Sequence, residues 1–332
     1  MVEAASTESF VIGVDIGGTK VAAGLVHRAT GEITRQARLP MSASGDAAAG
    51  LAAVTSTIDL LIKPAPSALG AITGIGICAP GPLDPYTGVV LNPPNVPCWR
   101  NFPLADEISR IYNLPVKVGN DANAAALAET LWGAGRGYGI VFYATIGTGI
   151  GTGIVFDGRI YHGRTGAAAE GGHMTIDYRG VLCACGKRGC IEALAAGPAI
   201  ARRARARLEG GNGGGSAILK LAGGNIEAIT SEMVGEAFAA GDAAAREVLE
   251  QTVEILAIWL GNIVDLLDPE VIILGGGGAA LLKPFFTMLR DRLPGYCLNP
   301  RSREIPLVAA CYGVDAGIAG GAALCSESLV MT

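Results

Sequence analysis

FVIGVDIGGTKVAAGLV, at residues 10–26, contains two apolar runs separated by a glycine pair. Each run, Phe10 to Asp15 and Val21 to Val26, has the length and composition of a buried strand. Gly17-Gly18 predicts the tight turn between them, because glycine adopts turn conformations at little steric cost. The chain therefore begins with a β-hairpin.

A second strand, glycine turn and strand occur in the middle of the chain. Residues 140–146 predict a strong strand, the glycine-rich segment 147–153 follows, and residues 154–156 lead into a hairpin turn at Asp157-Gly158. Two halves of the chain thus each begin with a strand, a glycine turn and a strand.

Apolar periodicity predicts the remaining elements. Helical spacing indicates helices over residues 47–62, 122–132, 242–267 and 316–329, and short apolar runs indicate strands over 72–77, 116–118 and 271–274. The first of these strands stops at Ala79-Pro80-Gly81-Pro82, which cannot continue regular structure. Asn120-Asp121 marks a change from strand to helix, and Gly210–Gly215 predicts a loop.

The composition indicates a soluble α/β enzyme. Half of the 332 residues are hydrophobic, yet no stretch approaches the ~20 uninterrupted apolar residues of a membrane span. Residues 1–10 lack a signal-peptide pattern, which predicts a cytoplasmic protein. The net charge is −5 and the short basic run at 202–205 predicts a solvated helix face, so no nucleic-acid partner is indicated.

A cysteine-rich segment carries the spacing of a metal site. Cys183, Cys185 and Cys190 follow His173 closely, and one imidazole with three thiolates is the ligand set of a closed structural zinc site. The alternative is a group of reduced thiols that cluster without a metal.

The surroundings of this segment favour the zinc interpretation. Gly186 and Gly189 allow a chain to fold tightly around an ion, because both can adopt positive φ. Glu170 lies three residues before His173, and Glu192 lies two after Cys190. One ion would therefore hold two carboxylates and an imidazole beside a common pocket, which predicts recognition of a hydroxyl-rich ligand.

Three glycine-rich turns follow strands and are candidates for phosphate binding. Without a Cβ, their backbone N–H groups can point at phosphate oxygens, and threonine hydroxyls add donors. The Walker pattern is absent, and the second turn lacks the helix and acidic residue of a dinucleotide-binding unit, so both of those readings are disfavoured. The candidate nucleotide contacts are Asp15, Gly17, Gly18, Thr19, Lys20, Thr148, Gly149, Gly276 and Gly277.

Two aspartates lie where these elements end. Asp15 ends its strand and can hold the hydration shell of Mg²⁺, or alternatively stabilise the turn. Asp121 can accept the proton of an attacking substrate hydroxyl, as an aspartate does in many kinases. It can equally be a helix N-cap, a position that favours Asn and Asp.

Taken together, these motifs resemble the ROK family of bacterial sugar kinases, repressors and open reading frames, over nearly the whole chain. The residues that carry the resemblance are Asp15–Lys20, Ala79–Asp84, Asn120–Ala124, Glu170–His173, Cys183–Glu192 and Gly275–Gly277.

The resemblance implies an α/β, two-domain, actin-like (ribonuclease-H-like) ATPase fold with an interdomain cleft. A small domain would comprise residues 1–119 and the C-terminal helix 316–332, and a larger domain, 120–315, would hold the zinc loop and a dimerisation surface. By the same resemblance Asp121 is the catalytic base, and the sugar-binding residues are Gly81, Asn95, Asn120, Asp121, Glu170, His173 and Glu192.

The activity implied is that of a homodimeric kinase which transfers phosphate from ATP, with Mg²⁺, to the 6-hydroxyl of glucose. A related kinase for fructose, mannose, allose, N-acetylglucosamine or N-acetylmannosamine remains an alternative, as does polyphosphate as the donor. A sugar-sensing repressor is disfavoured, because the first hairpin begins about ten residues from Met1 and leaves no room for a helix-turn-helix.

Overall fold

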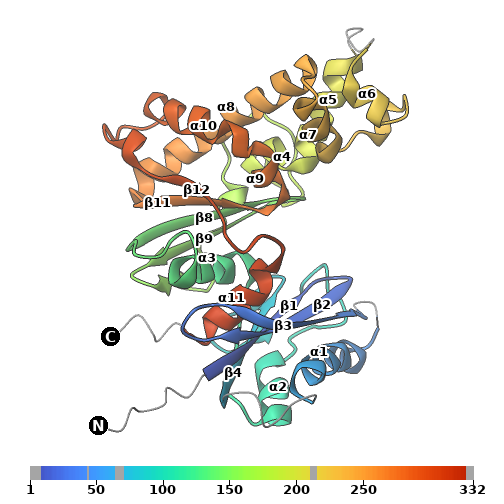
Figure 1. Cartoon of the computed structure of the whole chain (residues 1–332), viewed down its shortest axis with the longest axis vertical. Helices are drawn as coiled ribbons and strands as arrows, with labels where there is room; N and C mark the ends of the chain where they lie inside the picture. The colour runs from blue at the N-terminus through green and yellow to red at the C-terminus, as the bar shows by residue number, and fades with distance from the viewer. Residues whose placement is uncertain (1–8, 43–44, 64–70, 210–214, 327–332) are drawn as a thin grey trace. The chain divides into compact units, whose positions relative to one another are not determined.

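The computed structural model describes residues 9–42, 45–63, 71–209 and 215–326 (Figure 1). The chain forms two compact units. Within the described ranges, unit 1 contains residues up to Gly139, Gly153–Ala169 and the segment from Cys311 onward, and unit 2 contains Ile140–Thr152 and Glu170–Ala310. The domain boundary at 119/120 stays a prediction. Most of the predicted loop at 210–215 lies outside the described residues.

Unit 1 is built on a mixed five-stranded sheet with the order β3-β2-β1-β4-β7. Its strands are β1 (Ser9–Ile16), β2 (Lys20–His27), β3 (Ile33–Pro40), β4 (Ala71–Ala79) and β7 (Val116–Asn120). β1 pairs antiparallel with β2 and parallel with β4, and β4 pairs parallel with β7. The predicted N-terminal hairpin is therefore confirmed.

Helices pack on both faces of this sheet, because β1 alternates its side chains. Phe10, Ile12 and Val14 belong to the core beneath α1 (Ala47–Ile62) and α2 (Leu104–Tyr112), whereas Val11 packs with Ile318 on the opposite face. α11 (Ala316–Leu324) covers that opposite face and contacts α3 (Asp121–Trp132). Short strands β5 (Leu83–Asp84) and β6 (Val89–Val90) complete this region.

Glycines let the backbone of α11 lie directly on the sheet. A Cβ placed on Gly13 would come within 1.9 Å of the Ile318 carbonyl oxygen, and one on Gly76 within 1.8 Å of the Gly321 carbonyl oxygen. No side chain fits at either position. The close approach fixes where the first turn of α11 lies relative to β1.

The second sheet has the order β10-β9-β8-β11-β12. Its strands are β8 (Ile140–Ile146), β9 (Ile150–Phe156), β10 (Arg159–Ile160), β11 (Val271–Gly275) and β12 (Leu307–Ala309). Asp157 and Gly158 both have positive φ, +47° and +71°, which is the geometry of a two-residue hairpin turn, as predicted. β9 begins at Ile150, so the glycine turn spans only residues 147–149.

In unit 2 the long helix α8 (Ala243–Leu267) packs against the sheet (Figure 1). Asp242 caps it by accepting the N–H of Ala245 at 2.9 Å, and Trp259 packs edge-on against Phe142 of β8. The other helices are α4 (Ile191–Ala195), α5 (Gly197–Glu209), α6 (Ala217–Leu221), α7 (Ser231–Ala239), α9 (Gly276–Leu282) and α10 (Phe286–Arg292). Short 3₁₀ turns are η1 (Gly171–His173), η2 (Ile226–Ala228), η3 (Lys283–Phe285), η4 (Leu293–Gly295), η5 (Ser302–Glu304) and, in unit 1, η6 (Gly313–Asp315).

Three details differ from the sequence-based expectations. The final helix ends at Leu324 rather than at residue 329, and residues 327–332 lie outside the described part. The glycines after β11 open helix α9 instead of forming a turn. The basic run on α5 is only partly solvated, because Arg203 donates to the Leu194 carbonyl and to Thr252.

Across the described ranges, no helix combines the length and apolar character needed to cross a bilayer.

Candidate functional site

The carboxyl ends of three parallel strands bring the predicted residues of unit 1 together. In the register of the sheet, Asp15 of β1 lies beside Cys78 of β4, and Ala79 lies beside Asn120 of β7. Parallel strands end at the same edge of a sheet, so Asp15 and the start of α3 share that edge. The Gly81 segment follows β4 at this edge, and a Cβ on Gly81 would lie 3.9 Å from the Asn120 side-chain nitrogen.

Asn120, not Asp121, is the N-cap of α3. The Asn120 side-chain oxygen accepts the N–H groups of Ala122 at 3.0 Å and Asn123 at 3.2 Å. Asp121 is the first helical residue, and its exposed side chain accepts the adjacent N–H of Ala122 at 2.8 Å. An N-cap role therefore does not explain the aspartate at position 121.

The charge of Asp121 acts on the buried carboxyl group of Asp15. Burial raises the pKa of Asp15, the negative charge of Asp121 raises it further, and Lys20 and Arg38 oppose the shift. Asp121 keeps one face open to solvent, but the protein atoms around the rest of its side chain raise its pKa too, against hydrogen bonds from backbone N–H groups and from the side chain of Asn120. The pKa of the buried Cys78 thiol is raised by burial and then by both aspartates.

The first glycine hairpin lies against the segment that carries Asn95. The Gly17 N–H donates to the Lys20 carbonyl at 2.9 Å, which closes the turn. A Cβ on Gly18 would come within 2.7 Å of the Asn95 carbonyl oxygen. Thr19 and Lys20 at the tip are exposed. The structure thus places Asn95 beside the hairpin predicted to bind phosphate.

The second hairpin in unit 2 is tied to Glu192. Gly147 donates its N–H to the Gly149 carbonyl at 2.9 Å, leaving Thr148 exposed at the tip. The Glu192 Oε2 atom accepts the N–H of Ile150 at 2.9 Å, and a Cβ on Gly149 would come within 2.6 Å of that oxygen. Glycine is therefore required where the carboxylate approaches the hairpin.

Two of the three glycine segments line one cavity of about 510 Å³ in unit 2. Gly147 and Thr148 of the hairpin form one side and Gly277 and Gly278 of α9 another. Gly276, just outside the lining, has φ +82° and lies against the Ile146 backbone. The remaining wall contains polar and charged groups from α5 and the start of α7, namely Arg205, Thr230, Ser231 and Glu232.

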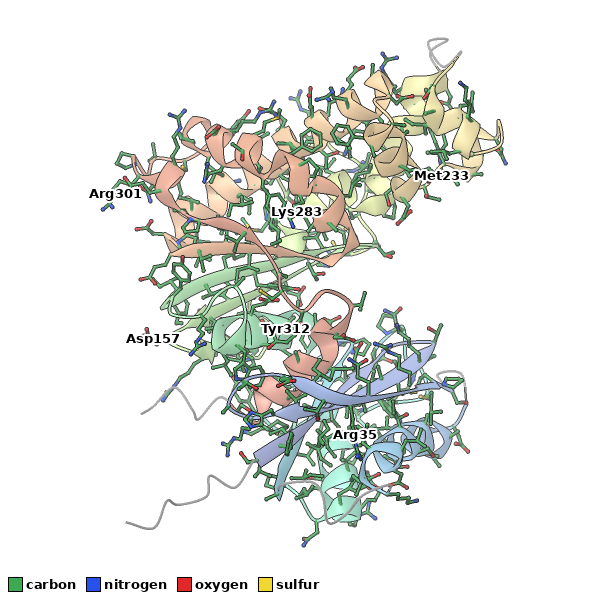
Figure 2. The ribbon with its side chains drawn as sticks, viewed as in Figure 1. Arg35, Asp157, Met233, Lys283, Arg301 and Tyr312 are labelled. Carbon is green, nitrogen blue, oxygen red and sulfur yellow. The ribbon has the colours of Figure 1, made fainter. Side chains whose placement is uncertain are left out.

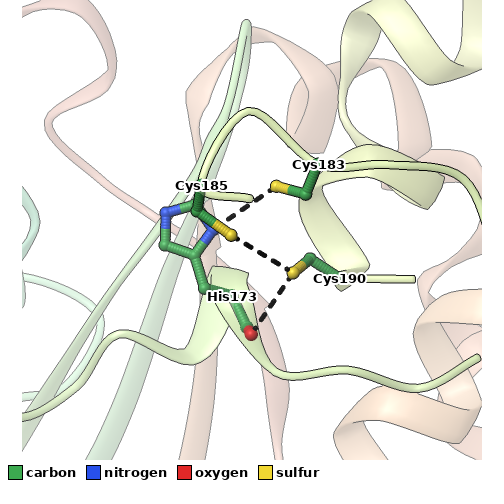
Figure 3. A group of neighbouring side chains, drawn as sticks. All are labelled: His173, Cys183, Cys185 and Cys190. Atoms are coloured by element: carbon green, nitrogen blue, oxygen red, sulfur yellow. Dashed lines mark hydrogen bonds between the residues drawn. The ribbon is translucent and has the colours of Figure 1, made fainter. Parts of the chain in front are cut away.

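The four predicted zinc ligands form a compact group (Figure 3). Their ligand atoms all lie within 4.8 Å of one another. The Cys183 Sγ is 3.7 Å from the His173 Nδ1, and the Cys185 and Cys190 Sγ atoms are 3.6 Å apart. Tetrahedral zinc with bonds of about 2.1–2.3 Å separates its ligands by about 3.4–3.8 Å, so the donor set fits this ion.

The backbone around this group has the predicted conformation. Gly186 and Gly189 have φ of +91° and +62°. A Cβ on Gly189 would come within 1.6 Å of the Asp177 carbonyl oxygen, so only glycine fits there. His173 ends the 3₁₀ turn η1, which Trp259 anchors by donating its indole N–H to the Gly171 carbonyl at 3.1 Å. The exposed Glu170 immediately precedes that turn.

Sequence reasoning missed two charged residues in these regions. Arg205 lines the glycine-walled cavity, although the basic run to which it belongs was expected to be solvated. Glu129 is 1% exposed and accepts backbone N–H groups from the nearby Ala134 and from the distant Cys311. The available signal for Glu129 was an acidic residue in the interior of the alanine-rich helix at 121–132, whose other acidic residue, Asp121, lies at its first position.

Comparisons with known proteins agree with this arrangement. The family model described as the ROK family matches residues 11–328. A glucokinase from Thermotoga maritima is 33% identical over 96% of this chain and 98% of its own length. The crystal structure of a ROK family glucokinase from Streptomyces griseus, in complex with glucose and AMPPNP, superposes with a TM-score of 0.79 at 33% identity, covering 95% of this chain and 98% of that one.

Relatives with other names lie at similar distances. An N-acetylmannosamine kinase from Escherichia coli is 33% identical over 94% of this chain and 97% of its length. A xylose repressor from Caldicellulosiruptor bescii is 29% identical over 85% of this chain and 69% of its length. The predicted actin-like α/β fold is confirmed by the match to the ROK glucokinase structure. The chain described here belongs to the ROK family.

Proposed function

We propose that this ROK sugar kinase is a glucokinase, which transfers the γ-phosphoryl group of ATP to the 6-hydroxyl of glucose. The observation that carries the proposal is the position of Asp121. Its carboxylate is released from helix capping by Asn120, keeps an open face, and has a raised pKa beside Asp15. Glucokinases among the relatives support glucose as the acceptor.

Asp121 supplies the general base in this proposal. As the sugar oxygen attacks the γ-phosphorus, the carboxylate takes the hydroxyl proton and ADP leaves with the electrons of the broken bond. A raised pKa makes the carboxylate a stronger base. The amide of Asn120 donates to Asp121 and so helps to orient it.

The nucleotide contacts are assigned to the glycine segments. Gly17, Gly18, Thr19 and Lys20 would bind phosphate from unit 1, with Asp15 holding the hydration shell of Mg²⁺. Thr148, Gly149, Gly276 and Gly277 would contribute from unit 2. The cavity that Thr148 and Gly277 line supports this assignment, because its glycine backbone admits phosphate oxygens at close range.

Sugar recognition is assigned to Gly81, Asn95 and Asn120 of unit 1 and to Glu170, His173 and Glu192 of unit 2. His173, Cys183, Cys185 and Cys190 would hold zinc, which supplies a fixed anchor rather than chemistry. With the His173 Nδ1 directed at the thiolates, the opposite ring nitrogen is left for a sugar hydroxyl. We further propose a cytoplasmic location, since thiolate zinc sites favour a reducing compartment. A homodimer is proposed from membership of the ROK family alone.

A kinase for N-acetylmannosamine is the second candidate, because such a kinase matches this chain as closely in identity as the glucokinase does. A coupled ADP-release assay with Mg²⁺ tests both. The panel comprises glucose, fructose, mannose, allose, N-acetylglucosamine and N-acetylmannosamine, with ATP and polyphosphate as alternative donors. We expect the highest kcat/KM for glucose with ATP. A preference of tenfold or more for an N-acetylhexosamine would identify the protein as an N-acetylhexosamine kinase instead. Turnover of no sugar would contradict the proposed kinase activity.

A further inference from the structure

Glu129 is a buried carboxylate that holds two segments far apart in the sequence. Its side chain is 1% exposed within α3. Oε1 accepts the N–H of Cys311 at 2.7 Å and of Tyr312 at 3.1 Å, and Oε2 accepts the N–H of Ala134 at 2.9 Å. All of these groups belong to unit 1.

One segment is where the chain first leaves unit 1, and the other is where it returns to unit 1 for the last time. Residues 133–139 lead to the first exit, Gly153–Ala169 belongs to the unit in between, and the last return is at Cys311. The backbone carbonyl of Glu129 adds to the first contact by accepting the N–H groups of Gly133 at 3.0 Å and Gly135 at 2.9 Å. One residue therefore accepts hydrogen bonds from the first exit and from the last return, which are called the two chain crossings below.

The local sequence is adapted to this carboxylate. A Cβ on Gly133 would come within 2.1 Å of the Glu129 Oε2, so glycine is needed for the carboxylate to reach Ala134. The nearby negative charge is also felt by Cys311 and Tyr312, whose pKa values are raised first by burial and then by Glu129. Both carboxylate oxygens accept N–H groups, Oε1 from Cys311 and Tyr312 and Oε2 from Ala134.

The returning segment leads directly to Asp15. After Tyr312, shown in Figure 2 in the segment that runs into α11, Asp315 pairs with Arg38 at 2.8 Å. Gly317 in the first turn of α11 lies against Asp15, since a Cβ there would come within 2.4 Å of the Asp15 Cγ. A shift of the segment at 311–315 would therefore move the backbone that packs on the Asp15 carboxylate.

We propose that Glu129 is a positioning residue for phosphoryl transfer: by fixing both chain crossings, it holds the first turn of α11 against Asp15. This inference rests on the proposed kinase activity. Glu129 touches neither of the proposed substrates. Its effect passes through the backbone of residues 311–317 to Asp15.

The test combines kinetics with amide hydrogen exchange on full-length Glu129→Gln. The carboxamide presents an NH₂ group to one of the N–H donors, so one crossing loses its acceptor. We expect exchange to accelerate by about tenfold or more in the peptide that loses its acceptor, either 133–135 or 311–312, and kcat with ATP and glucose to fall by a similar factor. The KM for glucose should change by less than about threefold.

Two further variants separate positioning from loss of stability. Thr130→Val removes a buried hydroxyl that bonds to Ala126 within the same helix, so it is expected to leave kcat and both crossings unchanged whatever it does to the Tm. Gly133→Ala displaces the Glu129 carboxylate but keeps the carboxyl group, and it should reproduce the kinetics and exchange of Glu129→Gln. If Glu129→Gln fails to fold, the kcat and exchange of Gly133→Ala test the positioning role instead.

Normal kcat in Glu129→Gln or Gly133→Ala, despite faster exchange or a lower Tm, would overturn the inference. The same holds if Thr130→Val loses kcat in proportion to its Tm. These results differ from failure of the proposed function, in which the wild-type protein itself would turn over no sugar.

Discussion

The Glu192 carboxylate lies between the second glycine hairpin and His173 of the proposed zinc-ligand group. Oε2 accepts the N–H of Ile150 at 2.9 Å, while Oε1 lies 4.0 Å from the His173 Nδ1. Of the residues assigned to the sugar in unit 2, Glu192 thus also supports a segment assigned to the nucleotide. Glu170, by contrast, has an exposed side chain ahead of η1.

Glu192→Ala should therefore raise the KM values for both ATP and glucose. Loss of the carboxylate leaves the Ile150 N–H without its acceptor and loosens the hairpin. Glu170→Ala is the matched control and should raise only the KM for glucose. We expect effects of about tenfold or more on each affected KM, measured with the other substrate saturating. An unchanged KM for ATP in Glu192→Ala would contradict the proposed coupling.

Cys185→Ser should lower both the zinc content and the affinity for glucose. Three ligands would remain, and the His173 ring would lose its fixed orientation. The expected loss in sugar affinity is about tenfold. Metal content is measured by elemental analysis and affinity by titration calorimetry. Cys297→Ser, at a half-buried thiol outside the cluster, should keep both properties. Full sugar affinity in zinc-free protein would show that the metal is dispensable.

Asp15→Asn should stabilise the protein at neutral pH while impairing catalysis. The folded-state pKa of Asp15 is raised above its ordinary value of 3.8, so the folded state binds this proton more tightly than the unfolded state does. The favourable contribution is complete below pH 3.8 and is lost as pH rises through the raised pKa. Relative to wild type, the variant should gain Tm at pH 7–8.

The gain in Tm of Asp15→Asn over wild type should shrink as the pH is lowered through the raised pKa of Asp15, because the wild-type carboxyl then also becomes neutral. Thermal unfolding of both proteins without Mg²⁺ measures this difference. The group of His173, Cys183, Cys185 and Cys190 is common to the two proteins, so their difference in Tm reports on Asp15. A gain in Tm that grows toward acidic pH would have the wrong sign.

Gly76→Ala should destabilise unit 1, because its Cβ would collide with the Gly321 backbone in α11. Rigid backbone leaves no flexible group to move aside, and overpacking of this kind costs about 1–3 kcal/mol. Gly295→Ala serves as the control, since nothing lies within 4 Å of its added Cβ. Chemical denaturation measures both. Equal stability of the two variants would argue against close packing of α11 on β4.

Local patterns predicted the elements that position the site. The N-terminal hairpin, the helix at 47–62 and the strand at 140–146 occur where apolar periodicity and turn glycines place them. The zinc group was likewise predictable, because its four ligands lie within one short segment and their spacing limits how they can meet.

Features that depend on distant contacts could not be predicted in this way. The glycines at 275–278 look like a turn in sequence. In the structure Gly276 and Gly278 lie where α9 packs on the Ile146 backbone, which leaves no room for a Cβ. The role of Glu129 depends on residues 311–312, which no local pattern links to α3. Whether Asn120 or Asp121 caps α3 depends on backbone dihedrals at a junction that favours both residue types.

Glucose-dependent ADP release by wild type and Asp121→Ala tests the central claim, that Asp121 is the general base of a sugar kinase. Both proteins are compared at matched zinc content with saturating ATP and Mg²⁺. Because Asn120 provides the cap, the variant should retain its fold, its zinc and its sugar affinity. We expect kcat to fall by about 10³-fold or more. A kcat within about threefold of wild type would show that the base lies elsewhere.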